Sequence, residues 1–199
     1  MIQALFSSPE PVWEALTSSV LSGKVPIKLP GSWQLMLLGD GSPTRHLSLL
    51  TGHEVKIELI AMELEPKDRS KGAPKEIFEL KSPLLRRQVW LQCGSQTLAW
   101  AESWWNKQEA EQHLKNKNQP IWQSLTQGRS ELFREVDGLA LVKAKWLENK
   151  FQREGPFWSR HYRFFRKERE LTVIREVFSP QLENWLGDSL RKQLNSSKN

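Results

Sequence analysis

One glutamate lies inside a run of residues that is typical of a β-strand. The run is Thr172–Phe178, and it is rich in β-branched side chains. Because side chains alternate across a strand, Glu176 is expected on the same face as Ile174 and Phe178. A carboxylate between two large apolar groups is costly to bury unless something makes use of it. Glu176 is therefore a candidate for proton or hydroxyl chemistry, although a solvated strand face would also explain the pattern.

An arginine occupies a similar position in a second expected strand, Leu84–Gln92. Alternation places Arg87 on the face that carries Val89 and Leu91, so it is expected on the core side. A guanidinium keeps its charge and needs an anion in such a place. A buried salt bridge to Glu176 is one explanation. The other is a carboxylate ligand, held by Arg87 as a fork, whose far end presents a hydroxyl or acidic proton to Glu176.

The elements around these two strands indicate an α+β protein with a largely antiparallel sheet flanked by helices. Further strands are expected at Glu54–Leu59, Thr97–Trp104, Leu139–Trp146 and Trp158–Arg166. Ser42 followed by Pro43 predicts the start of a helix, and Asn106 predicts the start of another. A short helix is expected from Ile121. The face of Ala99, Ala101 and Ser103 leaves room beside its strand.

The chain divides on these patterns into three parts. Residues 1–32 are expected to form an N-terminal helical extension, because Val12, Leu16 and Val20 have helical spacing. Residues 33–180 would form the α+β domain. Residues 181–199 would form a C-terminal amphipathic helix, over residues 181–194, and a disordered polar tail.

The composition excludes several classes of function. Cys93 is the only cysteine, which excludes a disulfide framework and a cysteine-based zinc site. The histidines have no metal-ligand spacing, and the chain has no glycine-rich phosphate loop. It has no signal-peptide pattern and no apolar run near the roughly 20 residues of a membrane span. We expect a cytoplasmic protein that needs no metal or organic cofactor and has no stable membrane insertion.

A net charge of +6 and ten tryptophans are also compatible with nucleic-acid binding. The arginines and tryptophans, however, fall on alternating and largely inward positions of the expected strands, and they do not form one solvated stripe. An anionic small molecule explains the positive charge as well. We therefore expect no nucleic-acid partner.

Five motifs, in this order, carry a resemblance to a known family: Gly41–Arg45, Leu84–Leu91, Gln119–Ile121, Trp158–Arg163 and Val173–Pro180. Their order and spacing resemble chorismate lyase (chorismate–pyruvate lyase), in its cyanobacterial and plastid-type branch. The resemblance covers about residues 33–180. It implies a cofactor-independent carbon–oxygen lyase that converts chorismate to 4-hydroxybenzoate and pyruvate, the first step toward the plastoquinone or ubiquinone head group. It also implies a ligand enclosed in an antiparallel α+β fold, and we expect a monomer.

The resemblance assigns roles to four residues. Arg87 corresponds to the arginine that binds the ring carboxylate, and Glu176 to the glutamate that meets the hydroxyl end of the ring. Ile121 falls where a leucine backbone amide contacts the ligand. Pro43 falls where the family has methionine; it has no backbone N–H to donate, but its carbonyl can accept.

The resemblance leaves the second carboxylate of chorismate without an assigned partner. Glu102 falls where the enterobacterial type has a further arginine. Arg160, Arg163 and Arg175 are the candidates to replace it. A different function, a small-aromatic-acid-binding sensor domain of the same fold without catalysis, stays open. Transcription regulators of that kind carry a DNA-binding module, for which the residues before the first motif leave little room.

Overall fold

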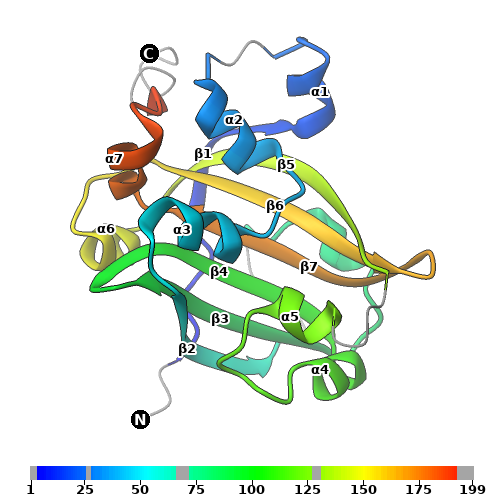
Figure 1. The fold of residues 1–199 in the computed structure, drawn as a ribbon. Coiled ribbons are helices and arrows are strands. Elements are labelled where there is room, and N and C mark those ends of the chain that lie inside the picture. The colour runs from blue at the N-terminus through cyan, green and yellow to red at the C-terminus, as the bar shows by residue number, and fades with distance from the viewer. Residues whose placement is uncertain (1–3, 26–27, 66–71, 127–130, 192–199) are drawn as a thin grey trace.

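The chain folds around one antiparallel sheet of seven strands. The computed structural model describes residues 4–25, 28–65, 72–126 and 131–191. The strands are β1 (Glu10–Leu16), β2 (Val55–Leu64), β3 (Leu84–Cys93), β4 (Gln96–Asn106), β5 (Phe133–Lys143), β6 (Phe157–Arg166) and β7 (Arg169–Phe178). Their order across the sheet is β1-β5-β6-β7-β4-β3-β2 (Figure 1). All six pairings are antiparallel. The predicted α+β class is confirmed.

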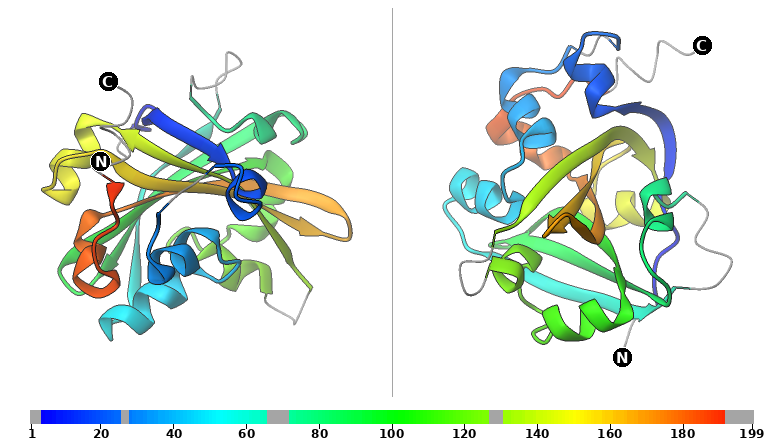
Figure 2. Two further views of the ribbon diagram at one scale, coloured as in Figure 1. Left: turned by 90° about the horizontal axis from the view of Figure 1, so that it is seen from above. Right: turned by 90° about the vertical axis from the view of Figure 1, so that its right-hand side faces the viewer.

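Short helices cover both sides of the sheet. They are α1 (Thr17–Leu21), α2 (Gly31–Leu38), α3 (Pro43–Thr51), α4 (Lys107–His113), α5 (Ile121–Thr126), α6 (Lys145–Phe151), α7 (Glu183–Leu186) and the 3₁₀ turns η1 (Lys75–Phe78) and η2 (Pro180–Leu182). Figure 2 shows α2 and α3 on one side, here called the α3 face, and α6 and η1 on the other, the α6 face. Among the described residues, none of the helices combines the length and the apolar character that crossing a bilayer requires.

Each face of the sheet has its own apolar core. Trp33, Leu47 and Leu91 belong to the cluster on the α3 face, whereas Trp100 and Phe151 belong to the cluster on the α6 face. Both sides of the central strands are therefore buried, as in a sheet covered by helices on each side. Alternation in residues 84–92 indicated one core side, that of Arg87, but the opposite side, with Arg86, Gln88 and Trp90, is buried as well.

The N-terminal segment is a strand of the sheet and not a helical extension. β1 pairs with β5, and among the described residues before α2 the only helix is α1, Thr17–Leu21. Of the apolar residues with helical spacing, Val12 and Leu16 lie in β1 and Val20 lies in α1. Pairing with β5 therefore decides the local structure of residues 10–16 against the helical pattern. Pro11 is tolerated because β1 is an edge strand, where a missing N–H costs no ladder bond. Trp13 packs edge-to-face on Trp158, with ring centroids 5.9 Å apart.

The expected C-terminal helix is much shorter than residues 181–194. The turn η2 leads into α7, which ends at Gly187 with φ +78°. A glycine in a positive-φ conformation is a common helix stop. The helical spacing of apolar residues in the sequence extends past Gly187, and for this reason it predicted too long a helix. Residues 192–199, including the expected tail, lie outside the described residues. The division of the chain at residues 32 and 180 stays a prediction.

The two helix starts predicted from capping residues are confirmed. Ser42 caps α3, whose first residue is Pro43. Asn106 caps α4, because its Oδ1 accepts hydrogen bonds from the backbone N–H groups of Gln108 (3.0 Å) and Glu109 (3.4 Å). The first residues of α3, Pro43 and Thr44, line the site described below.

Asn106→Ala is expected to lower the free energy of unfolding by about 1 kcal/mol, because two helix N–H groups lose their acceptor. Urea unfolding followed by tryptophan fluorescence measures the change. Asn149→Ala, at an exposed position of α6, is the matched control and should change stability by less than about 0.5 kcal/mol. Equal effects of the two substitutions would contradict the capping role.

Candidate functional site

A cavity on the α3 face lies between the sheet and the helices α3 and α5. It encloses about 460 Å³ of empty space, part of it open to solvent, but the centres of water molecules can reach only about 40 Å³. A ligand of aromatic-acid size would therefore have to separate the lining side chains. The cavity brings together Pro43, Arg87, Ile121 and Glu176, which lie on four different elements.

Small side chains form the floor of this cavity. Ala101 and Ser103, on β4, line it between the strand of Arg87 and the strand of Glu176. The register places Ser103 opposite Arg87 on β3 and Ala101 opposite Glu176 on β7. Larger residues at these two positions would fill the space between the two charged groups. The predicted room beside this strand is present.

Arg87 is buried without a carboxylate partner among the described residues. Its side chain is 3% exposed, and its Nη2 donates to the backbone carbonyls of Lys117 (2.6 Å) and Gln119 (3.5 Å). Its Nε is buried without a hydrogen-bond partner. Burial lowers the pKa of Arg87 to about 10, so the guanidinium remains a cation at neutral pH. The site therefore holds a positive charge and a free donor against the cavity.

Glu176 is held by two hydrogen bonds on the central strand β7. Its Oε2 accepts from Arg160 Nε at 2.8 Å, and its Oε1 accepts from the Tyr162 hydroxyl at 2.8 Å. Burial, and then the negative charge of Glu176, raise the pKa of Tyr162, which keeps the hydroxyl protonated as a donor. An ionised carboxylate offers about four acceptor positions. Glu176 therefore retains the capacity to accept a bond from a ligand hydroxyl.

Arg160 is committed to Glu176 and to the backbone. Beside the ion pair, its Nη1 donates to the carbonyls of Met36 (2.8 Å) and Gly39 (2.9 Å). Its side chain is fully buried. Its Nη2 has a longer contact, 3.5 Å, to the carbonyl of Gly41. Arg160 therefore orients Glu176 and holds the turn after α2, and its ionic partner is already Glu176.

None of the three candidate arginines is among the residues that line the cavity. Arg163 pairs with Asp137 at 2.6 Å on the opposite side of β6. Arg175 projects to the α6 face, where its Nε donates to Glu102 at 2.6 Å. Alternation along β7 necessarily separates Arg175 from Glu176.

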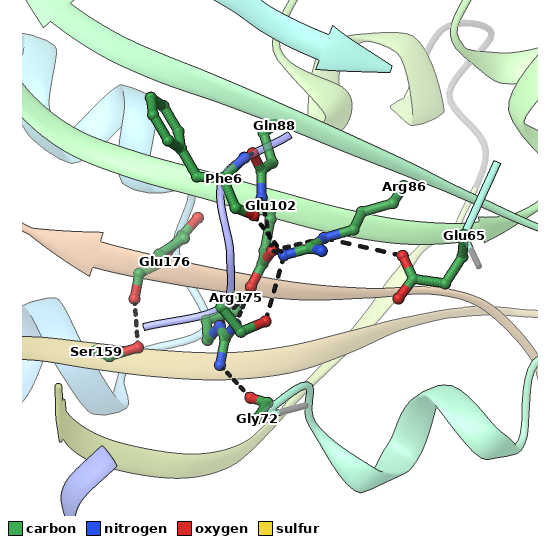
Figure 3. Close-up of polar contacts among 10 residues, drawn as sticks. Phe6, Glu65, Gly72, Arg86, Gln88, Glu102, Ser159, Arg175 and Glu176 are labelled. Carbon is green, nitrogen blue, oxygen red and sulfur yellow. Dashed lines mark hydrogen bonds and ion pairs between the residues drawn. The ribbon is translucent and has the colours of Figure 1, made fainter. Parts of the chain in front are cut away.

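Glu102 is the centre of a buried cluster on the α6 face. Its backbone borders the cavity, but its carboxylate lies between Arg86 and Arg175 (Figure 3). Arg86 Nε donates to Glu102 Oε2 at 2.9 Å, and Gln88 Nε2 donates to the same oxygen at 3.2 Å. Glu102 occupies the position where the enterobacterial type has an arginine, and its negative charge is neutralised by Arg86 and Arg175 on the α6 face, away from the cavity.

The structure adds an arginine that sequence reasoning missed. Arg134, on β5, lines the cavity, and its guanidinium lies over the rings of Tyr162 (4.7 Å) and Phe164 (4.6 Å). Its Nη1 donates to the carbonyls of Asp40 (2.6 Å) and Gly41. Its Nε is buried without a partner. The strand was expected to begin at Leu139 but begins at Phe133. An irregularity in its pairing between Val136 and Gly138 shifts the alternation by one residue, and this shift, which alternation alone would not predict, brings Arg134 to the face of Leu139.

A hydrogen bond joins the two helices that line the cavity. Trp122 Nε1, on α5, donates to the Thr44 hydroxyl, on α3, at 2.8 Å. Both side chains line the cavity. Within the described part of the chain, no group of three or more His, Cys, Asp or Glu side chains is placed to hold a metal ion.

The charges of the cavity suit a ligand with two negative groups. Arg160 neutralises Glu176, which leaves the guanidinium charges of Arg87 and Arg134 facing the enclosed space. Arginine binds carboxylates through paired N–H donors. Both arginines have a buried Nε without a partner. The two arginines can therefore bind the two negative groups of a small dianion, and the carboxylate of Glu176, which lies on a strand between theirs, can contact the part of the ligand in between.

Comparison with known proteins identifies a family and several relatives. The family model described as "Chorismate pyruvate-lyase Rv2949c-like" matches residues 37–186. The ycf21 protein of Cyanophora paradoxa is 34% identical over 150 residues, which cover 74% of this chain and 77% of that protein. The ycf21 protein of Porphyra purpurea is 34% identical over 167 residues, which cover 82% and 87%. These relatives agree with the cyanobacterial and plastid-type branch.

Solved structures share the fold at low sequence identity. PhnF from Mycobacterium smegmatis superposes with a TM-score of 0.52 and 11% identity, over 73% of this chain and 67% of PhnF. The effector domain of the same protein gives a TM-score of 0.52 and 12% identity, over 73% of this chain and 93% of the domain. At this identity the likeness establishes the fold alone.

Proposed function

Because this chain belongs to the chorismate pyruvate-lyase Rv2949c-like family, we propose that it converts chorismate to 4-hydroxybenzoate and pyruvate. The observation that carries the proposal is the single cavity that contains Arg87, Ile121, Pro43 and Glu176. The 4-hydroxybenzoate would supply the synthesis of a quinone head group, plastoquinone or ubiquinone.

In this proposal Arg87 binds the carboxylate on the ring. Its free Nε and its charge, in a largely buried position, favour a charge-assisted bond to an oxygen anion. The backbone bonds to Lys117 and Gln119 hold the guanidinium in place before the ligand arrives. A donor held in place before binding loses less conformational entropy when the ligand binds.

Glu176 accepts a hydrogen bond from the ring hydroxyl. Because Arg160 and Tyr162 hold both of its oxygens, the carboxylate has a defined orientation toward the cavity. During the reaction the bond between the ring and the ether oxygen breaks, and its electron pair goes to that oxygen. The ring carbon that bears the hydroxyl loses a proton, the ring becomes aromatic, and the enolpyruvate takes up a proton at its methylene carbon to give pyruvate. Glu176 would orient the hydroxyl and assist this proton transfer.

The decisive experiment is to incubate the purified protein with chorismate, without added metal, and to measure 4-hydroxybenzoate and pyruvate in the same samples. Equal amounts of both, formed faster than in a protein-free control, would support the lyase. The absence of both products from samples in which the protein is folded would contradict it.

A second candidate is a binding domain without catalysis, favoured by the likeness to the effector domain of PhnF and by the narrow cavity. In that case 4-hydroxybenzoate would bind, as measured by calorimetry, but chorismate would not be converted. Turnover that falls with the removal of Glu176 would exclude this candidate.

Arg87→Ala is expected to weaken 4-hydroxybenzoate binding by about 10- to 150-fold, the value of a hydrogen bond to a charged group. Calorimetric titration of the variant and the wild type measures the change. Arg169→Ala is the matched control, since Arg169 is 63% exposed and pairs only with Glu109 among the described residues. An unchanged affinity in the Arg87 variant would contradict its role as the ring-carboxylate partner.

A further inference from the structure

The charged groups of the cavity follow a definite order across the sheet. Arg87 lies on β3, Glu176 on β7 and Arg134 on β5, and the strands run β5-β6-β7-β4-β3. β7 is thus two strands from each arginine. With strands about 4.8 Å apart, roughly 10 Å of sheet separates Glu176 from either one. A positive, a negative and a second positive group therefore follow one another along the cavity.

Chorismate has a matching order of groups. One carboxylate is attached to one end of its ring. The hydroxyl is at the opposite end, and the ether oxygen beside it carries an enolpyruvyl unit with the second carboxylate. If Arg87 binds the ring carboxylate and Glu176 the hydroxyl, the enolpyruvyl unit projects sideways from the ring carbon next to the hydroxyl, and its carboxylate can extend to the side of β6 and β5. Arg134 is the arginine that lines the cavity there.

We propose that Arg134 binds the enolpyruvyl carboxylate and the adjacent ether oxygen, and so determines that the site takes the two-carboxylate substrate. This inference rests on the proposed lyase function. It assigns the contact for which Arg160, Arg163 and Arg175 were the alternative candidates. It also explains how the site functions although Glu102 replaces an arginine.

The contacts of Arg134 leave it able to perform this role. Nη1 is occupied by the carbonyls of Asp40 and Gly41, whereas Nε has no partner and is buried. The guanidinium also makes cation–π contacts with the rings of Tyr162 and Phe164, which limit its movement. Since the Tyr162 hydroxyl bonds to Glu176, the stacked tyrosine sets the spacing between the arginine and the carboxylate.

The surroundings of Arg134 contain an excess of positive charge. Burial lowers the pKa of His46, and the positive charges of Arg160 and Arg134 lower it further, although Glu176 acts in the opposite direction. His46 is therefore largely neutral at neutral pH and does not supply an additional cation. A carboxylate placed beside Arg134 would offset the excess of charge.

The ether oxygen gains the electron pair when its bond to the ring breaks. A guanidinium presents parallel N–H donors, so it can contact this oxygen and one carboxylate oxygen together. Donors aimed at an oxygen that gains charge stabilise the transition state, and loss of one typically costs about 10²- to 10³-fold in rate. Arg134 would then affect turnover as well as binding.

The test compares Arg134→Gln and Arg134→Lys with the wild type and with the exposed control Arg169→Gln. Steady-state kinetics with chorismate give kcat/KM, and calorimetry gives the Kd of 4-hydroxybenzoate, which lacks the second carboxylate. We expect Arg134→Gln to lower kcat/KM by about 10²- to 10³-fold and to change the Kd of 4-hydroxybenzoate less than threefold. Arg134→Lys should retain part of the activity, and Arg169→Gln should match the wild type.

Two results would overturn the inference. One is a kcat/KM of Arg134→Gln within threefold of the wild type. The other is an equal loss of 4-hydroxybenzoate affinity, which would mean that Arg134 only holds the turn of Asp40 and Gly41 in place.

Failure of the proposed function is distinguishable from failure of this inference. If the wild type does not convert chorismate, the lyase proposal fails, and the Kd of unreacted chorismate replaces kcat/KM as the readout. A tenfold or larger loss for chorismate alone in Arg134→Gln would still support the contact. Equal affinities in variant and wild type, or a wild type that binds neither compound, would overturn it.

Discussion

Replacing Glu176 by glutamine is expected to lower the turnover of chorismate by about two to four orders of magnitude, the usual contribution of a positioned acid or base. Glutamine has nearly the same shape, so the cavity keeps its volume. The amide loses the negative charge that the Arg160 ion pair and the Tyr162 hydroxyl orient toward the ligand. Product formation in single-turnover and steady-state assays measures the loss.

The control for this substitution is Glu111→Gln, a carboxylate on α4 that is 62% exposed. It should leave turnover unchanged. Because Arg160 loses its ionic partner in Glu176→Gln, thermal unfolding of the variant has to show that it is still folded at the assay temperature. Activity within threefold of the wild type in a folded Glu176→Gln protein would contradict the acid–base role.

Glu102→Ala is expected to cost about 3–5 kcal/mol of stability, because breaking a buried ion pair leaves an uncompensated charge. Here two cations lose the same partner, since the carboxylate lies between Arg86 and Arg175. Arg86 also lies 4.0 Å from Glu65, which offsets only part of the loss. Urea unfolding of the wild type and the variant measures the difference.

A surface ion pair provides the contrast. Glu111→Ala removes the exposed pair with Lys107 and should change stability by less than about 1 kcal/mol. If Glu102→Ala cost no more than this, the cluster in Figure 3 would not stabilise the fold. An arginine in place of Glu102 should be at least as harmful as alanine, because it would place a third cation between Arg86 and Arg175.

Glu102 also shows how the family pattern and the tertiary structure fit together. Arg86 and Arg175 lie on strands that flank β4, and both project to the α6 face. A glutamate between them neutralises charge that would otherwise be buried and unpaired. The second ligand contact then comes, in our proposal, from Arg134 on a strand that is not adjacent to β4.

The sequence alone predicted several local features correctly, although the apolar spacing near both ends of the chain predicted more helix than the structure has. Alternation identified Arg87 and Glu176 as charged groups on inward faces, because a strand has a period of two residues whatever its partners. Ser42, Pro43 and Asn106 marked the starts of helices, because capping depends on a few neighbouring backbone groups. The small residues of β4 predicted room beside them. Each of these inferences needs only information from one segment.

Only the tertiary structure decided which segments meet. Residues 10–16, expected to be helical, form an edge strand because they pair with β5. Arg134 lies over the Tyr162 ring because β5 pairs with β6. Arg160 was a candidate for the second carboxylate, but it donates to Glu176 and to the turn after α2. Partners across a sheet are distant in sequence, and burial on both faces removes the polar alternation that would distinguish a cavity from the core.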